Sequence, residues 1–267
     1  MTKIKPASAF ESDDGDKGQV SALARGLLLL DCFDSSERFL GIQDFVERSN
    51  LPKATVSRLA HTLTASGYLE YSDSLSKFYL GAHLMSLGFS VLGSLQVRQV
   101  ARPLMRELAE SCSASVALGT RDRDTMLYVE NAAGAANQNF RLSIGSRVPL
   151  ATTAMGRAHY CGLTEAERGL LLSGLAERSP SEFKQIKESL QAGLKSFKSL
   201  GFCVSVGDWQ SDVNAVAVPY RSADGTSVLS FNCCGPSFLI TPQDIAEKWG
   251  PRLLNMVQNI KAATSAA

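Results

Sequence analysis

The chain has 267 residues, 45% of them hydrophobic, and its 27 Lys and Arg residues nearly balance its 26 Asp and Glu residues. This length and composition predict one large or two ordinary globular domains with substantial cores. The near-neutral charge excludes a uniformly basic nucleic-acid binder, so any nucleic-acid contact must be local. The apolar runs are far shorter than the roughly 18 residues of a membrane span, and no secretory pattern opens the chain. We expect a cytoplasmic protein without a membrane partner.

The cysteines give no sign of a metal site or a disulfide framework. They show neither a C-x-x-C pair nor a zinc-ligand spacing with the three histidines. Buried free thiols are therefore expected, with no metal and no cofactor. The six residues are Cys32, Cys112, Cys161, Cys203, Cys233 and Cys234.

The first part of the chain predicts a tail and two helices. Residues 1–18 are polar, charged and aperiodic, which predicts a disordered tail. From Val20, apolar residues recur at helical spacing until the polar residues 34–36 end the pattern. A second helix of about two turns follows Gly41 and stops at residues 49–50.

A third helix is expected between Pro52, which suits a first helical turn, and Gly67, a natural C-terminal stop. One face is apolar, with Val56, Leu59, Ala60 and Leu63, and the opposite face carries Ala54, Ser57, Arg58, His61 and Ala65. A helix in a DNA major groove needs small residues for close approach and polar groups for base edges and phosphates. The acid-free outer face indicates such a helix, although an ordinary amphipathic helix would look similar.

Two short aromatic-rich strands, Tyr68-Leu69-Glu70-Tyr71 and Lys77-Phe78-Tyr79-Leu80, flank a polar turn at residues 72–76. Three helices followed by a hairpin predict a winged helix-turn-helix over residues 19–81. Its third helix would enter the groove, and its hairpin would touch the flanking backbone. The candidate DNA-binding residues are Lys53, Ala54, Thr55, Ser57, Arg58, His61, Thr62 and Lys77.

The rest of the chain predicts two linker helices and an α+β domain. Residues 82–111 are helical in pattern, with Gly88, Gly93 and Pro103 as bends or breaks. Residues 112–267 then group helices between hairpin strands, which is typical of an antiparallel sheet and not of a doubly wound one. Strands are expected at 115–120, 125–132, near 140–144, 202–206, 215–220 and 227–233, and helices at 153–161, 165–172, 182–200 and from Thr241-Pro242 onward, where Asp244 can act as a capping acid.

A candidate ligand site lies where the loop from Gly145 runs through Pro149 into a helix that Thr152 or Thr153 can cap. The backbone N–H groups and positive end of such a helix can hold a carboxylate without a lysine. An ordinary capped helix without a ligand is the alternative.

Several motifs together resemble the IclR family of bacterial transcription regulators. The stretches ARGLLLLDCF, LPKATVSRLAHTLTASGYLEY and FYLGAHLMSLG are similar to its DNA-binding half, and GSRVPLATTAMGRAHY and NAVAVPYRSADGTSVLSFNCCGP to its effector-binding half. The resemblance covers residues 20–262 in the family's order. It implies a GAF-like fold for the second half, linker helices that pack between subunits, operator DNA as partner, and a homodimer or dimer of dimers.

The resemblance also implies an effector pocket built from the loop at 145–156, residues 208–214 and the strand that ends at Gly235-Pro236. This sequence has Ala151 where the family often has histidine, Arg157 where it has lysine, no glycine near Asp212, and Asn232 and Cys234 where serines are common. The effector's identity therefore does not transfer. The N–H groups at the helix start favour a small carboxylic acid, and Met155, Trp209 and Phe231 favour an aromatic or extended body for it. The candidate effector residues are Gly145, Leu150, Ala151, Thr152, Thr153, Met155, Asp208, Trp209, Asn214, Asn232 and Cys234.

A thiol-dependent hydrolytic or metabolite-binding enzyme is the alternative from another class, with Cys161 or Cys234 as nucleophile. Against it, His159 and Cys161 point about 200° apart on a helix. Cys233 and Cys234 would face opposite sides of a half-buried strand. Redox sensing by these thiols is a third interpretation, although nothing basic adjoins them in sequence. We predict a ligand-responsive regulator of a catabolic operon, without catalytic residues.

Overall fold

The computed structural model describes residues 20–34, 37–134 and 142–265. The tail expected over residues 1–18 lies outside them. The chain divides into two units, Met1–Ser94 and Leu95–Ala267. Across the described residues, every helix is too short or too polar to cross a membrane.

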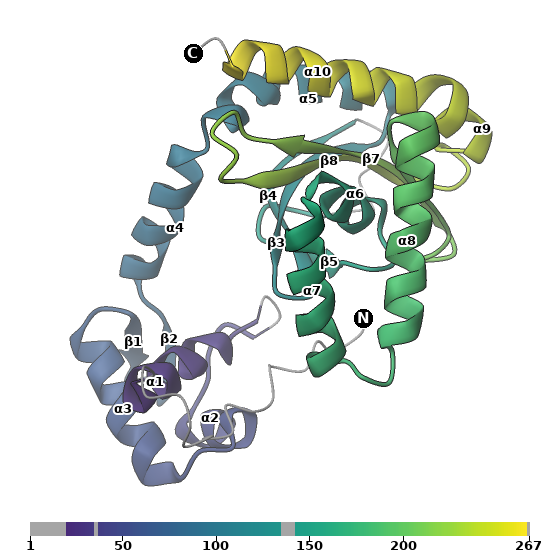
Figure 1. Cartoon of the computed structure of the whole chain (residues 1–267). Helices are drawn as coiled ribbons and strands as arrows, with labels where there is room; N and C mark the ends of the chain where they lie inside the picture. Colours follow the sequence, from purple (N-terminus) through teal and green to yellow (C-terminus); the bar gives the residue numbers. More distant parts are fainter. Residues whose placement is uncertain (1–19, 35–36, 135–141, 266–267) are drawn as a thin grey trace. The chain divides into compact units, whose positions relative to one another are not determined.

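The first unit has the predicted three helices and hairpin, followed by a fourth helix (Figure 1). In order, they are α1 (Ser21–Asp31), α2 (Ile42–Ser49), α3 (Lys53–Ala65), β1 (Leu69–Ser72), β2 (Lys77–Leu80) and α4 (Ala82–Ser94). The Asp44 carboxylate accepts a hydrogen bond from the Gly41 N–H (2.7 Å) and so satisfies the start of α2. Gly67 has a φ of 76° and turns the chain after α3 into β1.

A small core fixes how α3 is oriented in this unit. Its fully buried members are Leu29, Cys32, Leu40, Phe45, Val56, Ala60 and Leu69. Val56 and Ala60 come from the apolar face predicted for α3, so the opposite face points to solvent. Leu40 exchanges two backbone hydrogen bonds with Phe78 (2.9 and 2.8 Å), which attaches the hairpin to the helices. The winged helix-turn-helix is confirmed.

In the second unit, six described strands form one antiparallel sheet in the order β5-β4-β3-β8-β7-β6. The elements are α5 (Gln96–Cys112), β3 (Ser115–Asp122), β4 (Thr125–Ala133), β5 (Arg147–Pro149), α6 (Ala154–Gly162), α7 (Glu165–Arg178), α8 (Phe183–Leu200), β6 (Cys203–Val206), β7 (Val213–Arg221), β8 (Val228–Pro236), α9 (Pro242–Asp244), a π-helical turn (Ile245–Trp249) and α10 (Gly250–Ser265). The predicted α+β class is confirmed. At the start of α9, the Thr241 hydroxyl accepts a hydrogen bond from the Asp244 N–H (3.1 Å) and donates one to the Asp244 carboxylate (2.6 Å), so the expected capping acid contacts the cap residue at its hydroxyl.

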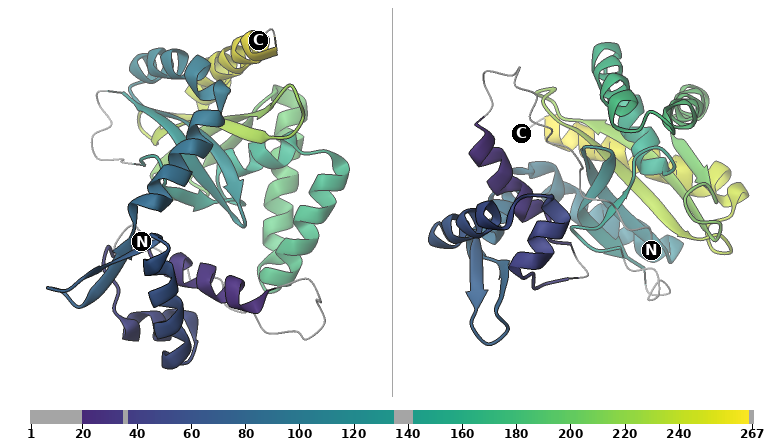
Figure 2. Two further views of the ribbon diagram at one scale, coloured as in Figure 1. Left: turned by 90° about the vertical axis from the view of Figure 1, so that its left-hand side faces the viewer. Right: turned by 90° about the horizontal axis from the view of Figure 1, so that it is seen from below.

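Helices cover both faces of this sheet. The helices α5 and α10 lie on one face and α6 on the other (Figure 1). Beyond α6, the helices α7 and α8 lie side by side (Figure 2). Cys233 and Cys234 face opposite sides, as predicted, because Cys233 contacts Cys112 of α5 and Cys234 contacts Tyr128 on the α6 side. The expectation of a half-buried strand is wrong, since β8 is buried from Val228 to Gly235.

Two further expectations differ from the structure. Of the strand expected near 140–144, residues 140–141 lie outside the described part, and 142–144 are not a strand. They lead into a turn in which the Ser146 N–H donates to the Ser143 carbonyl (2.9 Å), and the strand follows as β5. The expected linker of residues 82–111 shortens to α4, because α5 buries Ala101 and Met105 within the second unit. Pro103 lies inside α5 without ending it.

Candidate functional site

The outer face of α3 presents most of the predicted DNA-binding residues to solvent. The exposed members are Lys53, Ala54, Ser57, Arg58, His61 and Thr62, and Thr55 is half-buried. The helix contains no acidic residue. Two cations, an imidazole and two hydroxyl groups on a narrow face can contact phosphates and base edges.

The start of α3 adds a second feature that suits an anion. Pro52 occupies the N-cap position, and a proline side chain has no oxygen that could accept a hydrogen bond from the first-turn N–H groups. These donors and the positive helix end are suited to a phosphate, with Lys53 beside them.

Two cations lie at the hairpin, Lys77 of β2, which was predicted, and Arg38 of the segment before α2, which was not. The Lys77 ammonium lies 3.6 Å from the Asp44 carboxylate, which partly neutralises it. The pKa of Asp44 is lowered, chiefly by the hydrogen bond from Gly41 and further by Lys77. Arg38 is exposed and lies over the rings of Phe39 and Tyr79, at 5.2 and 5.9 Å from their centroids. In the sequence, only its place shortly before Leu40 could have indicated that Arg38 lies near the hairpin. The sequence did not predict that Leu40 pairs with β2.

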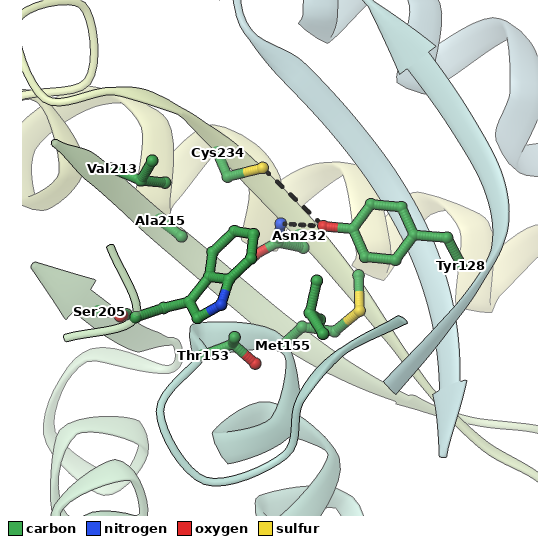
Figure 3. A pocket seen from close by; sticks show the side chains of 10 residues that line it. Tyr128, Thr153, Met155, Ser205, Val213, Ala215, Asn232 and Cys234 are labelled. Atoms are coloured by element: carbon green, nitrogen blue, oxygen red, sulfur yellow. Dashed lines mark hydrogen bonds between the residues drawn. The ribbon is translucent and has the colours of Figure 1, made fainter. Parts of the chain in front are cut away.

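In the second unit a narrow cavity lies between α6 and the sheet (Figure 3). Its lining residues come from the strands β4 to β8, from the start of α6 and from the β6–β7 connection. They are Tyr128, Val148, Thr153, Met155, Ser205, Trp209, Val213, Ala215, Asn232 and Cys234. The cavity volume is about 20 Å³, enough for about one water molecule. A larger ligand would have to push the walls apart.

Five of the predicted effector residues meet in this cavity: Thr153, Met155, Trp209, Asn232 and Cys234. The others lie elsewhere. Asn214 points away from the cavity, because its amide donates to the Ile240 carbonyl (2.9 Å) while its neighbours Val213 and Ala215 line the wall. Phe231 likewise faces the side opposite Asn232, and its ring packs edge-on against Tyr220 (6.1 Å between centroids).

The remaining predicted residues have structural partners. Leu150 is buried in the hydrophobic core that includes Met126 and Leu175. The Asp208 carboxylate accepts a hydrogen bond from Arg157 (2.7 Å). The carbonyls of Ala151 and Thr152 accept hydrogen bonds from Ser189 (2.7 Å) and Ser205 (3.0 Å), and Gly145 is exposed in the turn before β5.

Thr153, and not Thr152, caps α6. Its hydroxyl oxygen accepts a hydrogen bond from the Gly156 N–H (3.1 Å) and donates one to the Pro149 carbonyl (2.7 Å). Gly156 passes so close to the Leu150 carbonyl that any side chain would overlap it. The cap takes one of the N–H groups expected to hold a carboxylate. The backbone N–H groups of Ala154 and Met155 lie in the same first turn, where no carbonyl within the helix can accept a hydrogen bond from them.

The polar groups in the cavity wall are neutral. The Tyr128 hydroxyl accepts a hydrogen bond from the Asn232 amide nitrogen (3.4 Å) and lies 4.0 Å from the Cys234 sulfur. Burial raises the pKa of Tyr128 well above its usual range and that of Cys234 to about 11. The Asn232 amide oxygen is buried and has no hydrogen-bond partner among the described residues. A ligand that donates a hydrogen bond would satisfy it.

Sequence reasoning missed Tyr128, Val148, Ser205, Val213 and Ala215. Strand alternation indicates only that Val213 and Ala215 share a face. Their place in the same cavity wall as Asn232 and Cys234 depends on the β7–β8 register, in which Val213 pairs with Pro236 and Ala215 with Cys234.

The thiols do not form the thiol–imidazole pair that an enzyme of the alternative class would need. In the part of the chain that the structure describes, each thiol has a carbonyl, another thiol or the Tyr128 hydroxyl as its hydrogen-bond partner. Burial lowers the pKa of His159 to about 4, and its hydrogen bond goes to the Val228 backbone.

Comparisons with known proteins bear on both sites. A family model for the IclR helix-turn-helix domain matches residues 22–73, and one for the C-terminal part of bacterial IclR regulators matches residues 89–262. The chain is 32% identical over 252 residues to the HTH-type transcriptional regulator TsaQ1/TsaQ2 of Comamonas testosteroni, which covers 94% of this chain and 90% of that protein.

Two solved structures extend the comparison. An IclR-family transcriptional regulator from Brucella abortus is 40% identical, with 97% of each chain covered and a TM-score of 0.84. An IclR homologue from Microbacterium hydrocarbonoxydans, solved in complex with 4-hydroxybenzoate, is 21% identical and shares the fold, with 92% of this chain and 100% of that chain covered and a TM-score of 0.73. The winged helix, the sheet domain and these matches along nearly the whole chain lead to one conclusion: the chain belongs to the IclR family of bacterial transcriptional regulators.

Proposed function

We propose that this regulator controls a catabolic operon in response to a small carboxylic acid, an aromatic one such as 4-hydroxybenzoate among the candidates. The operator DNA would bind the outer face of α3, and the acid would enter the cavity between α6 and the sheet. Because bacterial DNA lies in the cytoplasm, we also place the protein there, and we assign it no catalytic activity.

The observation that carries the effector class is the chemistry of the cavity wall. The N–H groups at the start of α6 and the Tyr128 hydroxyl can hold a carboxylate without a cation. Met155 and Trp209 supply an apolar surface for a ring or carbon chain. The unpartnered Asn232 oxygen favours an acid that also carries a hydroxyl group. A sugar or polyphosphate fits this largely apolar wall poorly.

The tightness of the cavity gives a reason for a response to the effector. A ligand changes DNA affinity only if it binds one arrangement of the protein better than another. Because the cavity holds about 20 Å³, an acid of any size must displace its walls.

A bulge in β4 offers a route from the cavity to α5. The register between β3 and β4 shifts so that Tyr128 pairs with Gly119 while Glu130 pairs with Leu118. Tyr128 faces the cavity, whereas Glu130 binds two arginines of α5. A ligand that moves Tyr128 would thus act on the strand that holds α5.

We also propose that the protein works as a homodimer or a dimer of dimers. The helix α4 has no buried residue and exposes Met85, Phe89 and Val91, each more than 60% accessible. An apolar helix gains stability by packing against another surface, and a second copy of α4 would supply one. Two copies would also present two copies of α3 to a near-palindromic operator.

The effector site is tested by titration calorimetry with a panel of small acids that includes 4-hydroxybenzoate. Asn232→Leu removes the amide at nearly constant size. It should lower the affinity for the acid about tenfold or more, since a buried ligand hydroxyl would lose its partner. Asn259→Leu makes the same change on the exposed side of α10 and should leave the affinity unchanged. Equal affinities for wild type and Asn232→Leu would place the pocket elsewhere.

A further inference from the structure

Four of the six cysteines lie in two thiol pairs that are far apart in sequence. The sulfur atoms of Cys161 and Cys203 are 3.5 Å apart, and those of Cys112 and Cys233 are 3.7 Å apart. All six thiols are free. A disulfide bond brings two sulfur atoms to about 2.05 Å, so each pair would need a modest approach of two packed elements.

The two pairs differ in access. Cys161 is partly exposed in the last turn of α6, and Cys203, at the first residue of β6, is buried beneath it. Cys112 and Cys233 are both buried between α5 and the sheet. A small oxidant dissolved in water therefore reaches the first pair and not the second.

The chemistry of the first pair also suits oxidation. A hydrogen bond from Cys203 lowers the pKa of Cys161, against the effect of burial, and Arg168 lowers it further. The same hydrogen bond, together with burial, raises the pKa of Cys203 well above its usual range. The accessible thiol is thus the one that ionises more easily, and its protonated neighbour is placed to complete the bond.

We propose that Cys161 and Cys203 form a reversible disulfide bond when a small peroxide, such as hydrogen peroxide, reaches Cys161. The Cys161 thiolate attacks one peroxide oxygen, the O–O bond breaks, and sulfenic acid and hydroxide form. The Cys203 thiol then attacks the sulfenic sulfur, which releases its oxygen as water. In sum, two thiols lose two electrons and two protons, and one peroxide becomes two water molecules. A dithiol reductant reverses the bond by exchange.

The bond would join two elements that both border the cavity. The helix α6 contributes Met155 at its start, and β6 contributes Ser205 two residues after Cys203. Small side chains, Ala154 and Ala158, form the α6 surface next to Cys203, and the Arg157 guanidinium of α6 donates to the Val204 carbonyl of β6 (2.7 Å), so the two elements pack closely. A covalent link at Cys161 opposes the separation that ligand entry requires. This consequence, weaker effector binding after oxidation, rests on the proposed function.

The bond itself is tested without any effector. The full-length protein is treated with hydrogen peroxide, alkylated, digested and analysed by mass spectrometry without reduction. We expect a linked peptide pair containing Cys161 and Cys203, lighter than the two free peptides by the mass of two hydrogen atoms, and its loss after dithiothreitol. A link between Cys112 and Cys233, or over-oxidation of Cys161 with Cys203 intact, would overturn the proposal. These outcomes are read in the wild type and need no variant.

Variants then measure what the bond does. Because it closes a 42-residue separation, oxidised wild type should unfold at a Tm about 5 to 10 °C above the reduced form. Cys161→Ser should abolish this difference, whereas Cys233→Ser should retain it. Affinity for 4-hydroxybenzoate should fall about tenfold on oxidation of the wild type and stay constant in Cys161→Ser. Equal affinities in both redox states would refute the coupling, and an absence of binding in both states would exclude 4-hydroxybenzoate as the effector while the disulfide stands.

Discussion

Single residues on α3 are expected to make different kinds of contact. Arg58 lies in the middle of the exposed face, where its guanidinium can donate two hydrogen bonds to a guanine. Lys53 lies beside the helix start, where a phosphate is favoured. The two cations should therefore affect specificity and general affinity in separate ways.

Arg58→Ala should weaken binding to the protein's own upstream DNA by about 1 to 3 kcal/mol while leaving binding to unrelated DNA nearly unchanged. Lys53→Ala should weaken both to a similar degree. Fluorescence anisotropy at fixed salt measures both constants, and Lys261→Ala, exposed on α10, is the matched control. If Arg58→Ala keeps full operator affinity, Arg58 is not part of the recognition surface.

His159 should make the stability of the second unit depend on pH. Burial holds its pKa at about 4 instead of the ordinary 6.5, with Arg121 and Arg221 lowering it further and Glu167 and the Val228 carbonyl opposing them. As the pH falls, the His159 imidazole is therefore protonated at a higher pH in the unfolded chain than in the folded one. The buried neutral imidazole therefore contributes about 3 kcal/mol to the free energy of unfolding. This contribution is fully present above about pH 6.5 and is lost as the pH falls toward about 4.

Urea unfolding of wild type and His159→Gln at pH 7 and pH 4.5 tests this. The variant, whose side chain stays neutral, should lose less stability between the two pH values than the wild type loses. Carboxylates that titrate in the same range act on both proteins alike. Parallel losses would show that His159 is not the titrating group.

At the residue scale the sequence predicted only part of the cavity. Thr153 was found through its capping chemistry, Met155 through its apolar bulk beside the loop, and Trp209 through the segment 208–214 that the family resemblance implied. Tyr128 and Ser205 were missed, because their side chains reach the cavity through strand pairings between residues distant in sequence. Asn214 was misplaced for the same reason: the face on which a strand residue lies depends on register.

At the scale of elements, one buried carboxylate holds α5 against β4. Both Arg98 and Arg102 bind the same oxygen of Glu130, each at 2.9 Å, and the Glu130 side chain is only 7% exposed. Two guanidinium groups would lose their shared partner if Glu130 were removed. The pairing therefore contributes more to stability than an exposed ion pair would.

Glu130→Ala should lower the unfolding free energy of the second unit by about 3 to 5 kcal/mol. Arg102→Ala should cost less than about 1 kcal/mol, because Arg102 is 57% exposed and Arg98 remains bound to Glu130. Chemical denaturation followed by circular dichroism compares the two. Similar losses in both variants would contradict the assignment of Glu130 as the central partner.

Most elements could be predicted from local signals. Helical periodicity, Gly67 and the aromatic strands located α3 and the hairpin, because these signals act within a few residues. The short strand β5 and the packing of α5 could not be predicted in this way. β5 has three residues and exists through pairing with β4, and α5 belongs to the second unit because its apolar side is buried there.

At the scale of the whole molecule, α4 should be a contact between subunits. Phe89→Glu places a charge on its apolar side and should weaken the dimer by tenfold or more, since a buried unpaired carboxylate is costly. Ser90→Glu, the matched control, places the same charge on the serine-bearing side of α4. Sedimentation equilibrium measures both. A wild-type monomer that binds one asymmetric DNA site tightly would contradict the dimer.

The central claim is that an acid bound between α6 and the sheet changes DNA affinity. The most direct measurement is the affinity of the full-length protein for its own upstream DNA, without acid and with 4-hydroxybenzoate, or another acid from the panel that binds, at about ten times the wild-type Kd of that acid. We predict that the acid changes this affinity about fivefold or more in wild type and in Asn259→Leu, and much less in Asn232→Leu. An affinity that no binding acid alters, or an unchanged response in Asn232→Leu, would contradict it.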